Sequence, residues 1–300
     1  MGTPFISILE PSKFEGYDRT KTFAEQPDKA SIPKVFMDAM EVREAVFVGE
    51  QNMPLQYEYD DDDPRSCHWV IYASVREVVE EEKRDPQTGE TIQPRRSETR
   101  TQPIGTMRIV PFPQPPHPKP GGWYEDYKLV DPPPSAAYLS TSSAPKVEVP
   151  KPGYISEAAA ATGLGVGATS LAAPETLPQY QQDRATTFHN GQEPYVKVGR
   201  LAVHPNFRGR KISSQLWMAA RDWLKANPRY FDPSVTERGM EALNAHSANE
   251  IPRWGGLVYA HVQEAATKVY ARWGFQVDEG MGRWHEEGVP HVGMFIRLDV

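Results

Sequence analysis

Cysteine is almost absent from this chain of 300 residues, which contains Cys67 alone. A single cysteine excludes a disulfide within the chain and any metal site built from several thiolates, and it fits a reducing compartment. No apolar run reaches the length of a membrane span, and the chain does not open with a basic segment followed by an apolar core. These absences predict an intracellular protein with no membrane partner, and the cytoplasm is preferred over the nucleus only by default.

An excess of positive charge is also missing. The 33 Lys and Arg residues stand against 40 Asp and Glu, a formal net charge of −7, which argues against a general nucleic-acid binder. Hydrophobic residues at 39% and charged residues at 24% are typical of a soluble globular protein, and the length allows one large or two small domains. Proline is abundant, at 29 residues or about twice the usual share, so we expect part of the chain to lie outside the packed core.

The N-terminal third shows three regular patterns. A short apolar, β-branched run predicts a strand over 5–9, and apolar residues at helical spacing predict a helix over 35–48 that ends at Gly49. Strands over 68–75 and 105–110 flank the charged segment 77–100. Because that segment contains the turn sequence Asp85-Pro-Gln-Thr-Gly89, we interpret it as a hairpin with a solvated tip.

The stretch 195–223 combines a strand, a basic turn and a helix. Val196 and Val198 share one parity and Leu201 and Val203 the other, so the apolar phase shifts by one residue across Gly199-Arg200. Such a shift indicates a β-bulge. The turn Arg208-Gly-Arg-Lys211 precedes a helical pattern that Asn227-Pro228 ends. Since the first N–H groups of a helix are unpaired and its dipole adds positive potential, this arrangement predicts a site for a phosphate-bearing ligand.

The same residues resemble the acyl-coenzyme A motif of the GNAT N-acetyltransferases, Arg/Gln-x-x-Gly-x-Gly/Ala. Arg208 matches the first position, whereas Lys211 and Ser213 stand where glycine and glycine or alanine are usual. A side chain there crowds the approach of the backbone to a pyrophosphate, and the charge of Lys211 offsets this in part.

Further blocks resemble the ElaA-like branch of that family and follow in the family order. They are Arg43-Glu-Ala-Val-Phe-Val-Gly-Glu-Gln51, the acidic run 60–63, His68-Trp-Val, Gly105-Thr-Met-Arg, Gln263-x-x-Ala266-x-x-x-Tyr270-x-x-x-Gly-Phe275 and Glu286-Glu-Gly-Val-Pro-His291. Together the blocks cover 35–75, 104–110, 195–226 and 256–298.

The resemblance implies one α/β (α+β) GNAT domain over 1–300, with a twisted, mainly antiparallel mixed sheet that is flanked by helices and splayed between 195–203 and 257–260. It implies acetyl-CoA as the co-substrate and direct transfer of an acetyl group to a primary amine, with no metal. The expected coenzyme residues are Leu201, Ala202, Val203, Arg208, Gly209, Arg210, Lys211, Ile212, Ser213, Ser214, Gln263, Ala266 and Tyr270.

The resemblance also implies that Tyr270 protonates the departing thiolate, a role that suits a phenol because it donates a proton without carrying charge at neutral pH. An amine must lose a proton before it attacks, and Glu50, His68 and His291 are the candidate bases. A packed aromatic residue and hydrogen-bonded structural histidines are the plain alternatives. The acidic residues Glu58 and 60–63 favour a cationic small molecule or a lysine side chain as acceptor, although such a run also fits an ordinary solvated loop.

Residues 111–192 break the pattern. Twelve prolines between Pro111 and Pro152 precede an Ala-, Gly-, Ser- and Thr-rich section, so we interpret 111–192 as an insertion on or off the surface. Its proline-rich part offers an SH3- or WW-like protein a binding segment, although a flexible linker explains the composition more simply. The alternative to an enzyme is therefore a catalytically weak, acyl-CoA-binding GNAT-fold protein that acts through this segment. The oligomeric state is open.

Overall fold

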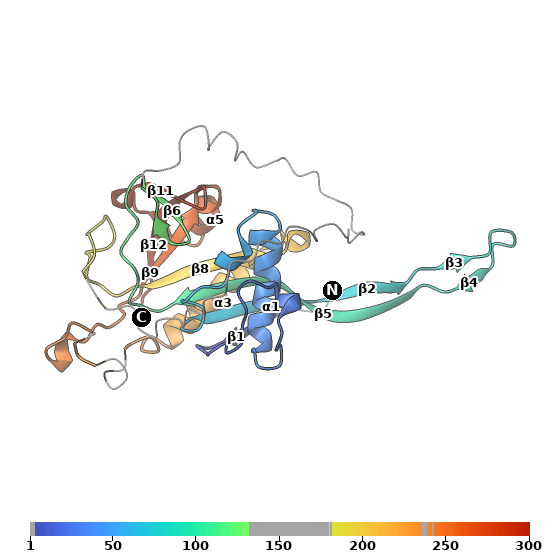
Figure 1. The fold of residues 1–300 in the computed structure, drawn as a ribbon, viewed down its shortest axis with the longest axis horizontal. Coiled ribbons are helices and arrows are strands. Elements are labelled where there is room, and N and C mark those ends of the chain that lie inside the picture. Colours follow the sequence, from blue (N-terminus) through green and yellow to red (C-terminus); the bar gives the residue numbers. More distant parts are fainter. Residues whose placement is uncertain (1–3, 132–179, 181, 234, 236–238, 242) are drawn as a thin grey trace, which may run out of the picture.

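A mixed sheet of ten strands organises the molecule (Figure 1). A computed structural model describes residues 4–131, 180, 182–233, 235, 239–241 and 243–300. The strand order is β1-β2-β5-β8-β9-β12-β11-β6-β7, and β10 pairs with β12. All but two of the pairings in this sheet are antiparallel, the exceptions being β8 with β9 and β11 with β6.

The first three strands of the sheet form an antiparallel meander with a projecting arm. β1 (Phe5–Leu9) lies at the residues predicted, and β2 (Cys67–Glu80) pairs with β5 (Arg96–Val110). The outer parts of β2 and β5 run away from the body towards β3 (Lys83–Arg84) and β4 (Thr91–Gln93) (Figure 1). Gly89, at φ +73°, donates its N–H to the Asp85 carbonyl at 2.9 Å. The predicted hairpin and its turn are confirmed.

One face of the sheet is covered by the N-terminal helix. The short 3₁₀ turn η1 (Phe23–Glu25) precedes α1 (Lys34–Arg43), which continues directly into one π-helical turn, η2 (Glu44–Val48). Ala39 packs with Val70 of β2, and Val42 with Ala202 of the central strand. The helix predicted over 35–48 is thus confirmed, but its π-helical end, a feature frequent at functional sites, left no sign in the apolar spacing. A further 3₁₀ turn, η3 (Leu55–Tyr57), follows.

The opposite face carries the central helix. β8 (Val196–Val203) leads through η4 (Pro205–Phe207) into α3 (Ile212–Ala226), which ends at Asn227 as predicted. Leu216, Ala220 and Leu224 recur at helical spacing and are fully buried against the sheet. Burying each leucine contributes roughly 1.5–3 kcal/mol, so this stripe fixes how α3 lies across β8 and its neighbours.

The C-terminal part completes the sheet. η5 (Ala248–Glu250) precedes β9 (Leu257–Gln263), η6 (Glu264–Ala266), α5 (Thr267–Ala271), β10 (Gln276–Val277), η7 (Glu279–Met281), β11 (Arg283–Glu286) and β12 (Val289–Arg297). α5 begins only at Thr267, because Gln263 still pairs with His291 in the ladder of β9 and β12. None of the helices in the described ranges has the length and apolar character needed to cross a bilayer.

The ends of segment 111–192 belong to the fold, which corrects the prediction of a surface insertion for them. β6 (Trp123–Glu125) pairs with β11, and β7 (Lys128–Leu129) pairs with β6. His117, Trp123 and His189 are buried. The high proline content led to the prediction of a surface insertion, but these aromatic side chains pack in the interior. Residues 132–179, which include most of the proline-poor Ala/Gly section, lie outside the described residues.

Candidate functional site

The central strands β8 and β9 separate part of the way along their length. Their parallel pairing runs from Val196 with Val258 to Val198 with Ala260. Beyond this point the described residues of the two strands form no further pair, while β8 remains paired with β5 and β9 with β12. The predicted splay is therefore confirmed, and the edge of β8 over 199–203 that faces β9 has main-chain groups available to a ligand.

The predicted bulge lies at the mouth of this opening. The register between β5 and β8 shifts between Thr106 and Arg108, and Arg200 adopts a left-handed backbone with φ +49°. A non-glycine residue in this region is strained by about 1 kcal/mol or more and needs surrounding contacts to hold it. The one-residue phase shift in the sequence was the signal for it.

The turn before α3 keeps a glycine-like backbone although a lysine occupies it. Lys211 has φ +60° and ψ +24°, and Gly209 has φ +75° with open space where a Cβ would stand. The left-handed conformation at Lys211 explains why glycine is usual at this position. The turn therefore retains its shape, and the first N–H groups of α3, over 212–214, point away from the helix body as they do at any helix start.

Arg208 bridges two groups beside the opening. Its Nε donates to the Val203 carbonyl at 3.0 Å, and its Nη2 lies 2.5 Å from Glu50 Oε2. Both side chains of the ion pair are partly exposed, so the pair contributes at most about 1 kcal/mol and an anion can displace it. The carboxylate of Glu50, one of the candidate bases, is thus paired with Arg208 beside the basic turn.

The remaining predicted coenzyme residues surround the same opening. Gln263, at the end of β9, donates its side-chain amide to Gln51 Oε1 at 3.0 Å, which links β9 to the segment after η2. The predicted residues lie in three groups: Leu201, Ala202 and Val203 on β8; Arg208, Gly209, Arg210, Lys211, Ile212, Ser213 and Ser214 on the turn and the first turn of α3; and Gln263, Ala266 and Tyr270 from β9 to α5.

Tyr270 is buried on the α3 face of the sheet. Its ring packs on Trp273 and Phe275, at centroid distances of 5.0 and 5.4 Å. Burial raises the pKa of the phenol, so Tyr270 keeps its proton at neutral pH. The contacts of the ring are those of a packed aromatic residue, and the role of proton donor remains the prediction from the resemblance.

His68 does not have the surroundings of a base. It lies on β2, two strands from β8, with Phe14 and Phe36 at ring distances of 6.1 and 5.3 Å, and its Nε2 contacts the Asp63 carbonyl at 2.9 Å. Burial lowers its pKa to about 4. With 1% of its side chain exposed, His68 is a structural residue, and we do not retain it as a catalytic candidate.

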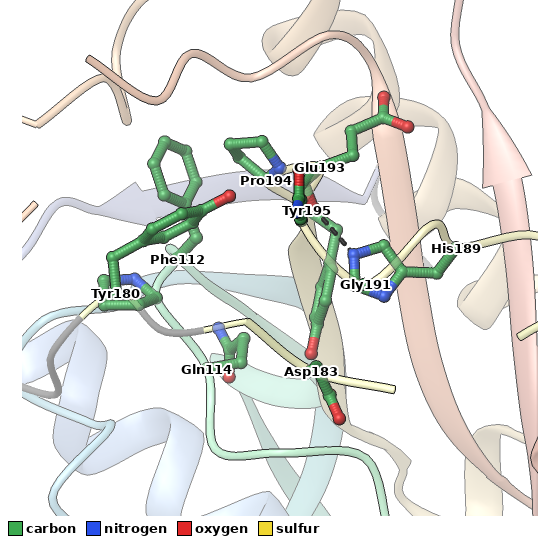
Figure 2. A pocket seen from close by; sticks show the side chains of 11 residues that line it. Phe112, Gln114, Tyr180, Asp183, His189, Gly191, Glu193, Pro194 and Tyr195 are labelled. Carbon is green, nitrogen blue, oxygen red and sulfur yellow. Dashed lines mark hydrogen bonds between the residues drawn. The ribbon is translucent and has the colours of Figure 1, made fainter. Parts of the chain in front are cut away.

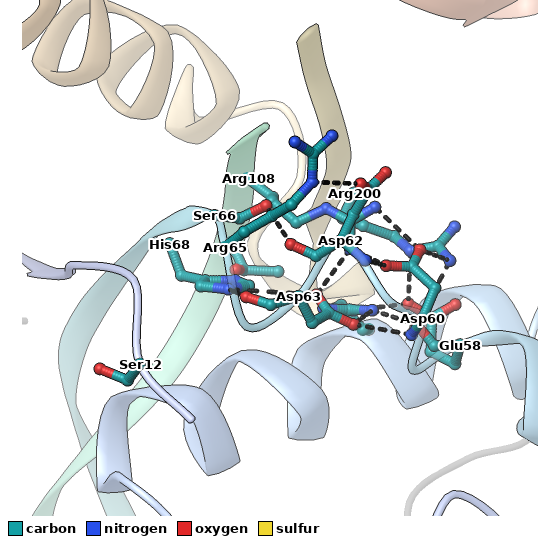
Figure 3. Close-up of polar contacts among 12 residues, drawn as sticks. Ser12, Glu58, Asp60, Asp62, Asp63, Arg65, Ser66, His68, Arg108 and Arg200 are labelled. Carbon is teal, nitrogen blue, oxygen red and sulfur yellow. Dashed lines mark hydrogen bonds and ion pairs between the residues drawn. The ribbon is translucent and has the colours of Figure 1, made fainter. Parts of the chain in front are cut away.

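The acidic run is not the solvated loop that its composition suggests (Figure 3). Arg43 is fully buried, with Nε 2.5 Å from Glu58 Oε1 and Nη1 2.8 Å from Asp63 Oδ1. Arg108 Nη1 lies 2.5 Å from Asp60 Oδ1 and 2.7 Å from Asp63 Oδ1. Three buried carboxylates, those of Glu58, Asp60 and Asp63, are therefore neutralised within the chain.

The same network holds the bulge. Arg200 Nη2 donates to Asp60 Oδ2 at 3.0 Å and to the Tyr57 carbonyl at 2.9 Å, and it also contacts the hydroxyl of Tyr127. The Arg108 and Arg200 guanidinium groups hold the pKa of Asp60 well below its ordinary value. The network thus supplies the contacts that the left-handed backbone at Arg200 requires.

Buried histidines make stability depend on pH. The pKa of His68 is lowered to about 4, that of His117 to about 3 and that of His261 to about 4, chiefly by burial, whereas burial raises that of Glu44 to about 7. In the unfolded chain histidine binds its proton near pH 6.5, so acidification from 6.5 to 4 favours unfolding through the histidines and opposes it through Glu44.

We expect His68→Gln to reduce the loss in the free energy of unfolding between pH 7 and pH 4 by about 3 kcal/mol. This amount corresponds to the lowering of the pKa of His68 from 6.5 to about 4. Urea unfolding at a series of pH values measures it. His246→Gln, at an exposed position, is the control and leaves the slope unchanged. An equal slope for wild type and His68→Gln would show that His68 is not the titrating group.

A cluster on the α1 face, one residue past the last pair of β8 and β9, joins two residues of the C-terminal motif, Glu286 and His291, to His261, which no motif marked. His261 of β9 has Nδ1 2.5 Å from Glu286 Oε1 of β11, and Trp284 Nε1 donates to the same oxygen at 2.7 Å. His291 has Nε2 3.9 Å from Glu286 Oε2. Lys197 of β8 adds positive charge that acts on Glu286. Only the pairing of β9, β12 and β11 brings these residues together.

His291, the C-terminal base candidate, is held by its own turn. Its Nδ1 donates to the Val289 carbonyl at 2.8 Å, and 8% of its side chain is exposed. His261 is more open, at 18%. Of the three predicted bases, Glu50 is thus paired with Arg208, His68 is enclosed, and His291 is hydrogen-bonded beside Glu286.

A small cavity lies at the other end of β8 (Figure 2). It measures about 30 Å³ and is lined in part by Phe112, Tyr180, His189 and Tyr195. His189 Nε2 contacts the Glu193 carbonyl at 2.9 Å. Since one water needs roughly 10–15 Å³, the cavity holds water rather than a substrate, and Tyr195 precedes the paired end of β8, opposite the splay.

Comparisons with known proteins bear on this site. Residues 179–246, which include β8, the basic turn and α3, match the sequence model described as "Acetyltransferase (GNAT) family". A comparison with curated proteins gives no match.

Similar solved structures include a Lactobacillus plantarum protein provisionally described as an N-acetyltransferase, with a TM-score of 0.43 and 15% identity over 99% of this chain and 100% of that one. Escherichia coli ElaA and an acyl-CoA N-acyltransferase from Pseudomonas aeruginosa each have a TM-score of 0.39 and 14% identity over 98% of this chain and 99% of theirs. TM-scores this low carry no inference about activity. The family match falls on the splayed strand, the basic turn and the central helix, so the similarity to GNAT acetyltransferases covers the central elements of the candidate site.

Proposed function

We propose that this protein transfers an acetyl group from acetyl-CoA to a primary amine. The observation that carries the proposal is the splay of β8 and β9, with its free strand edge leading into a basic turn and the start of α3. A free strand edge accepts an extended amide-containing chain as another strand would, and the basic turn with a helix start suits a pyrophosphate. These two features fit the pantetheine arm and the diphosphate of coenzyme A.

Each part of the site has a defined task in this proposal. Acetyl-CoA supplies the acyl group as an activated thioester. The edge over 199–203 binds the arm, and Arg208 with the turn and first α3 residues binds the diphosphate. Tyr270 gives its proton to the departing thiolate, and an N–H at the bulge stabilises the negative charge that develops on the carbonyl oxygen.

The acceptor is a primary amine, and Glu58, Asp60 and Asp63 do not select for its charge, since they are paired with arginines. A panel that spans cationic, neutral and anionic amines is the appropriate screen, with thiol release from acetyl-CoA as the readout. Preference for polycations in that screen would have to arise from groups other than these three carboxylates.

Calorimetric titration tests the ligand class. We expect acetyl-CoA to bind, and free adenosine and NAD to bind far more weakly, because only acetyl-CoA presents both the pantetheine arm and a diphosphate in register with the site. Equal affinity for NAD, or no binding of acetyl-CoA, would contradict the proposal.

Arg208→Ala tests the anion site. Loss of a charged contact to a diphosphate is expected to weaken acetyl-CoA binding about 10-fold, on the basis of roughly 1.5–3 kcal/mol for a hydrogen bond to a charged group. Arg221→Ala, further along α3 and paired with its neighbour Asp222, is the matched control and keeps wild-type affinity. Equal affinity for both variants would place the diphosphate elsewhere.

A further inference from the structure

We propose that His261 is the general base that removes the proton of the attacking amine, and that Glu286 is the positioning residue that orients it. The inference rests on the proposed function and adds a residue that the family motifs in the sequence did not indicate. Two observations support it: His261 lies directly after the last pair of β8 and β9, and its Nδ1 contacts Glu286.

The backbone places His261 at the opening of the splay. It follows Ala260, the last residue of β9 that pairs with β8. Ala260 and Val262 are buried in the core on the α3 face, so alternation along the strand puts His261 on the opposite, α1 face. Tyr270 belongs to the α3 core. His261 and Tyr270 thus lie on opposite faces of the sheet.

The contact with Glu286 determines which ring nitrogen of His261 is basic. Glu286 accepts hydrogen bonds from Trp284 Nε1 at 2.7 Å and lies 2.5 Å from His261 Nδ1. The hydrogen bond from His261 and the charge of Lys197 hold the pKa of Glu286 well below its ordinary value, so Glu286 is ionised and can only accept. Nδ1 therefore carries the proton, and Nε2 carries the lone pair. Among the described residues nothing donates to that Nε2.

The charges around His261 keep it neutral before reaction. Burial lowers its pKa to about 4, the positive charge of Lys197 acts in the same direction, and so does His291, while Glu286 opposes them. The imidazole is therefore already deprotonated at neutral pH. An amine nitrogen becomes strongly acidic as it bonds to the carbonyl carbon, so even a base of low pKa can receive its proton.

The step balances in protons and electrons. A charged amine first loses one proton to solvent. The lone pair of the neutral amine then forms the C–N bond, the C–S bond breaks with its electron pair on sulfur, and Tyr270 gives its proton to that sulfur. His261 Nε2 takes the proton from nitrogen, and the resulting imidazolium is stabilised by Glu286, as in other His-carboxylate pairs. Proton exchange with solvent restores both residues.

His261 has advantages over His291 for this role. His291 is the less exposed of the two, and its Nδ1 is hydrogen-bonded to the backbone of its own turn. Its Nε2 lies 3.9 Å from Glu286, whereas the Nε2 of His261 is on the side away from that carboxylate because Nδ1 faces it. Glu286 thus directs the free nitrogen of His261 outward.

Nitrogen-15 NMR of the histidine rings tests the arrangement without any acceptor. For the full chain we expect His261 to be neutral at pH 7 with the proton on Nδ1. In Glu286→Leu no acceptor faces Nδ1, so the ring proton is no longer held on that nitrogen and the Nε2–H tautomer gains. A wild-type His261 with its proton on Nε2, or one that is charged at pH 7, would overturn the proposal whatever the acceptor is.

Kinetics test the role. With spermidine and Nα-acetyl-lysine amide as probe amines, we expect His261→Asn to lower kcat about 100-fold or more while calorimetric affinity for acetyl-CoA is unchanged. Imidazole added to His261→Ala restores part of the rate, with a pH dependence that follows free imidazole. His285→Ala, on β11 and stacked on Trp123, stays within about twofold of wild type.

Two outcomes would refute the assignment of the base. One is a normal rate for His261→Asn on an amine that the wild type acetylates, and the other is a large loss in His291→Asn without one in His261→Asn. Failure of the proposed function has a different signature, because it appears as absent acetyl-CoA binding in the wild-type protein.

Discussion

Replacing Arg43 with methionine is expected to lower the free energy of unfolding by about 3–5 kcal/mol, the usual cost of breaking a buried ion pair from one side. Arg43 is fully buried and donates to Glu58 and to Asp63, which are themselves buried. Methionine matches its length but supplies no donor, so two carboxylates keep their burial and lose a partner. Urea unfolding of the full chain at neutral pH measures the change.

Arg96→Met is the matched control for Arg43→Met. Arg96 pairs with Glu80 and Glu98 on the exposed arm, where such pairs contribute at most about 1 kcal/mol. Arg43→Lys keeps the charge without the planar fork and should fall between the two, which keeps the test informative when Arg43→Met does not fold. Similar midpoints for Arg43→Met and Arg96→Met would show that the network is not a source of stability.

Tyr270→Phe is expected to lower kcat about 100-fold, the lower end of the contribution of a positioned proton donor, while acetyl-CoA binding is retained. The phenol keeps its proton at neutral pH because burial raises its pKa, and phenylalanine fills the same space against Trp273 and Phe275 without a donor. Thiol release with a series of amines measures kcat, and calorimetry with acetyl-CoA measures the binding affinity.

The control for Tyr270→Phe is Tyr230→Phe, at a partly exposed tyrosine whose ring packs on Trp223 of α3. This substitution should leave kcat unchanged. An undiminished rate in Tyr270→Phe would leave Tyr270 as a packed aromatic residue and require another source for the thiolate's proton.

Local patterns in the sequence determined the central elements. The strand at 5–9, the hairpin at 85–89, the bulge near Arg200 and the end of α3 at Asn227 were all readable, because each depends on side-chain alternation, turn residues or helix-stop residues within a few positions. The family resemblance also located the splay of β8 and β9, since its motifs lie on those strands and on the elements that follow them.

The prediction of a solvated acidic loop was wrong because it depends on contacts between residues far apart in the sequence. Glu58 and Asp60 resembled a solvated loop because their partners Arg43, Arg108 and Arg200 lie 15 to 142 positions away along the chain. Hydropathy within a window contains no information about such partners. Burial of 111–131 escaped notice likewise, because its contacts are made with β11.

What the sequence by itself determined about this protein is its resemblance to the GNAT acetyltransferases, the order of its main elements and the position of the basic turn before α3, all of which rest on short-range spacing. The tertiary structure alone decided which acidic residues are neutralised, that a lysine adopts the left-handed backbone of the turn, and that His261 meets Glu286. These features arise where strands far apart in sequence become neighbours, and pairing between strands is set by the whole sheet rather than by any one segment.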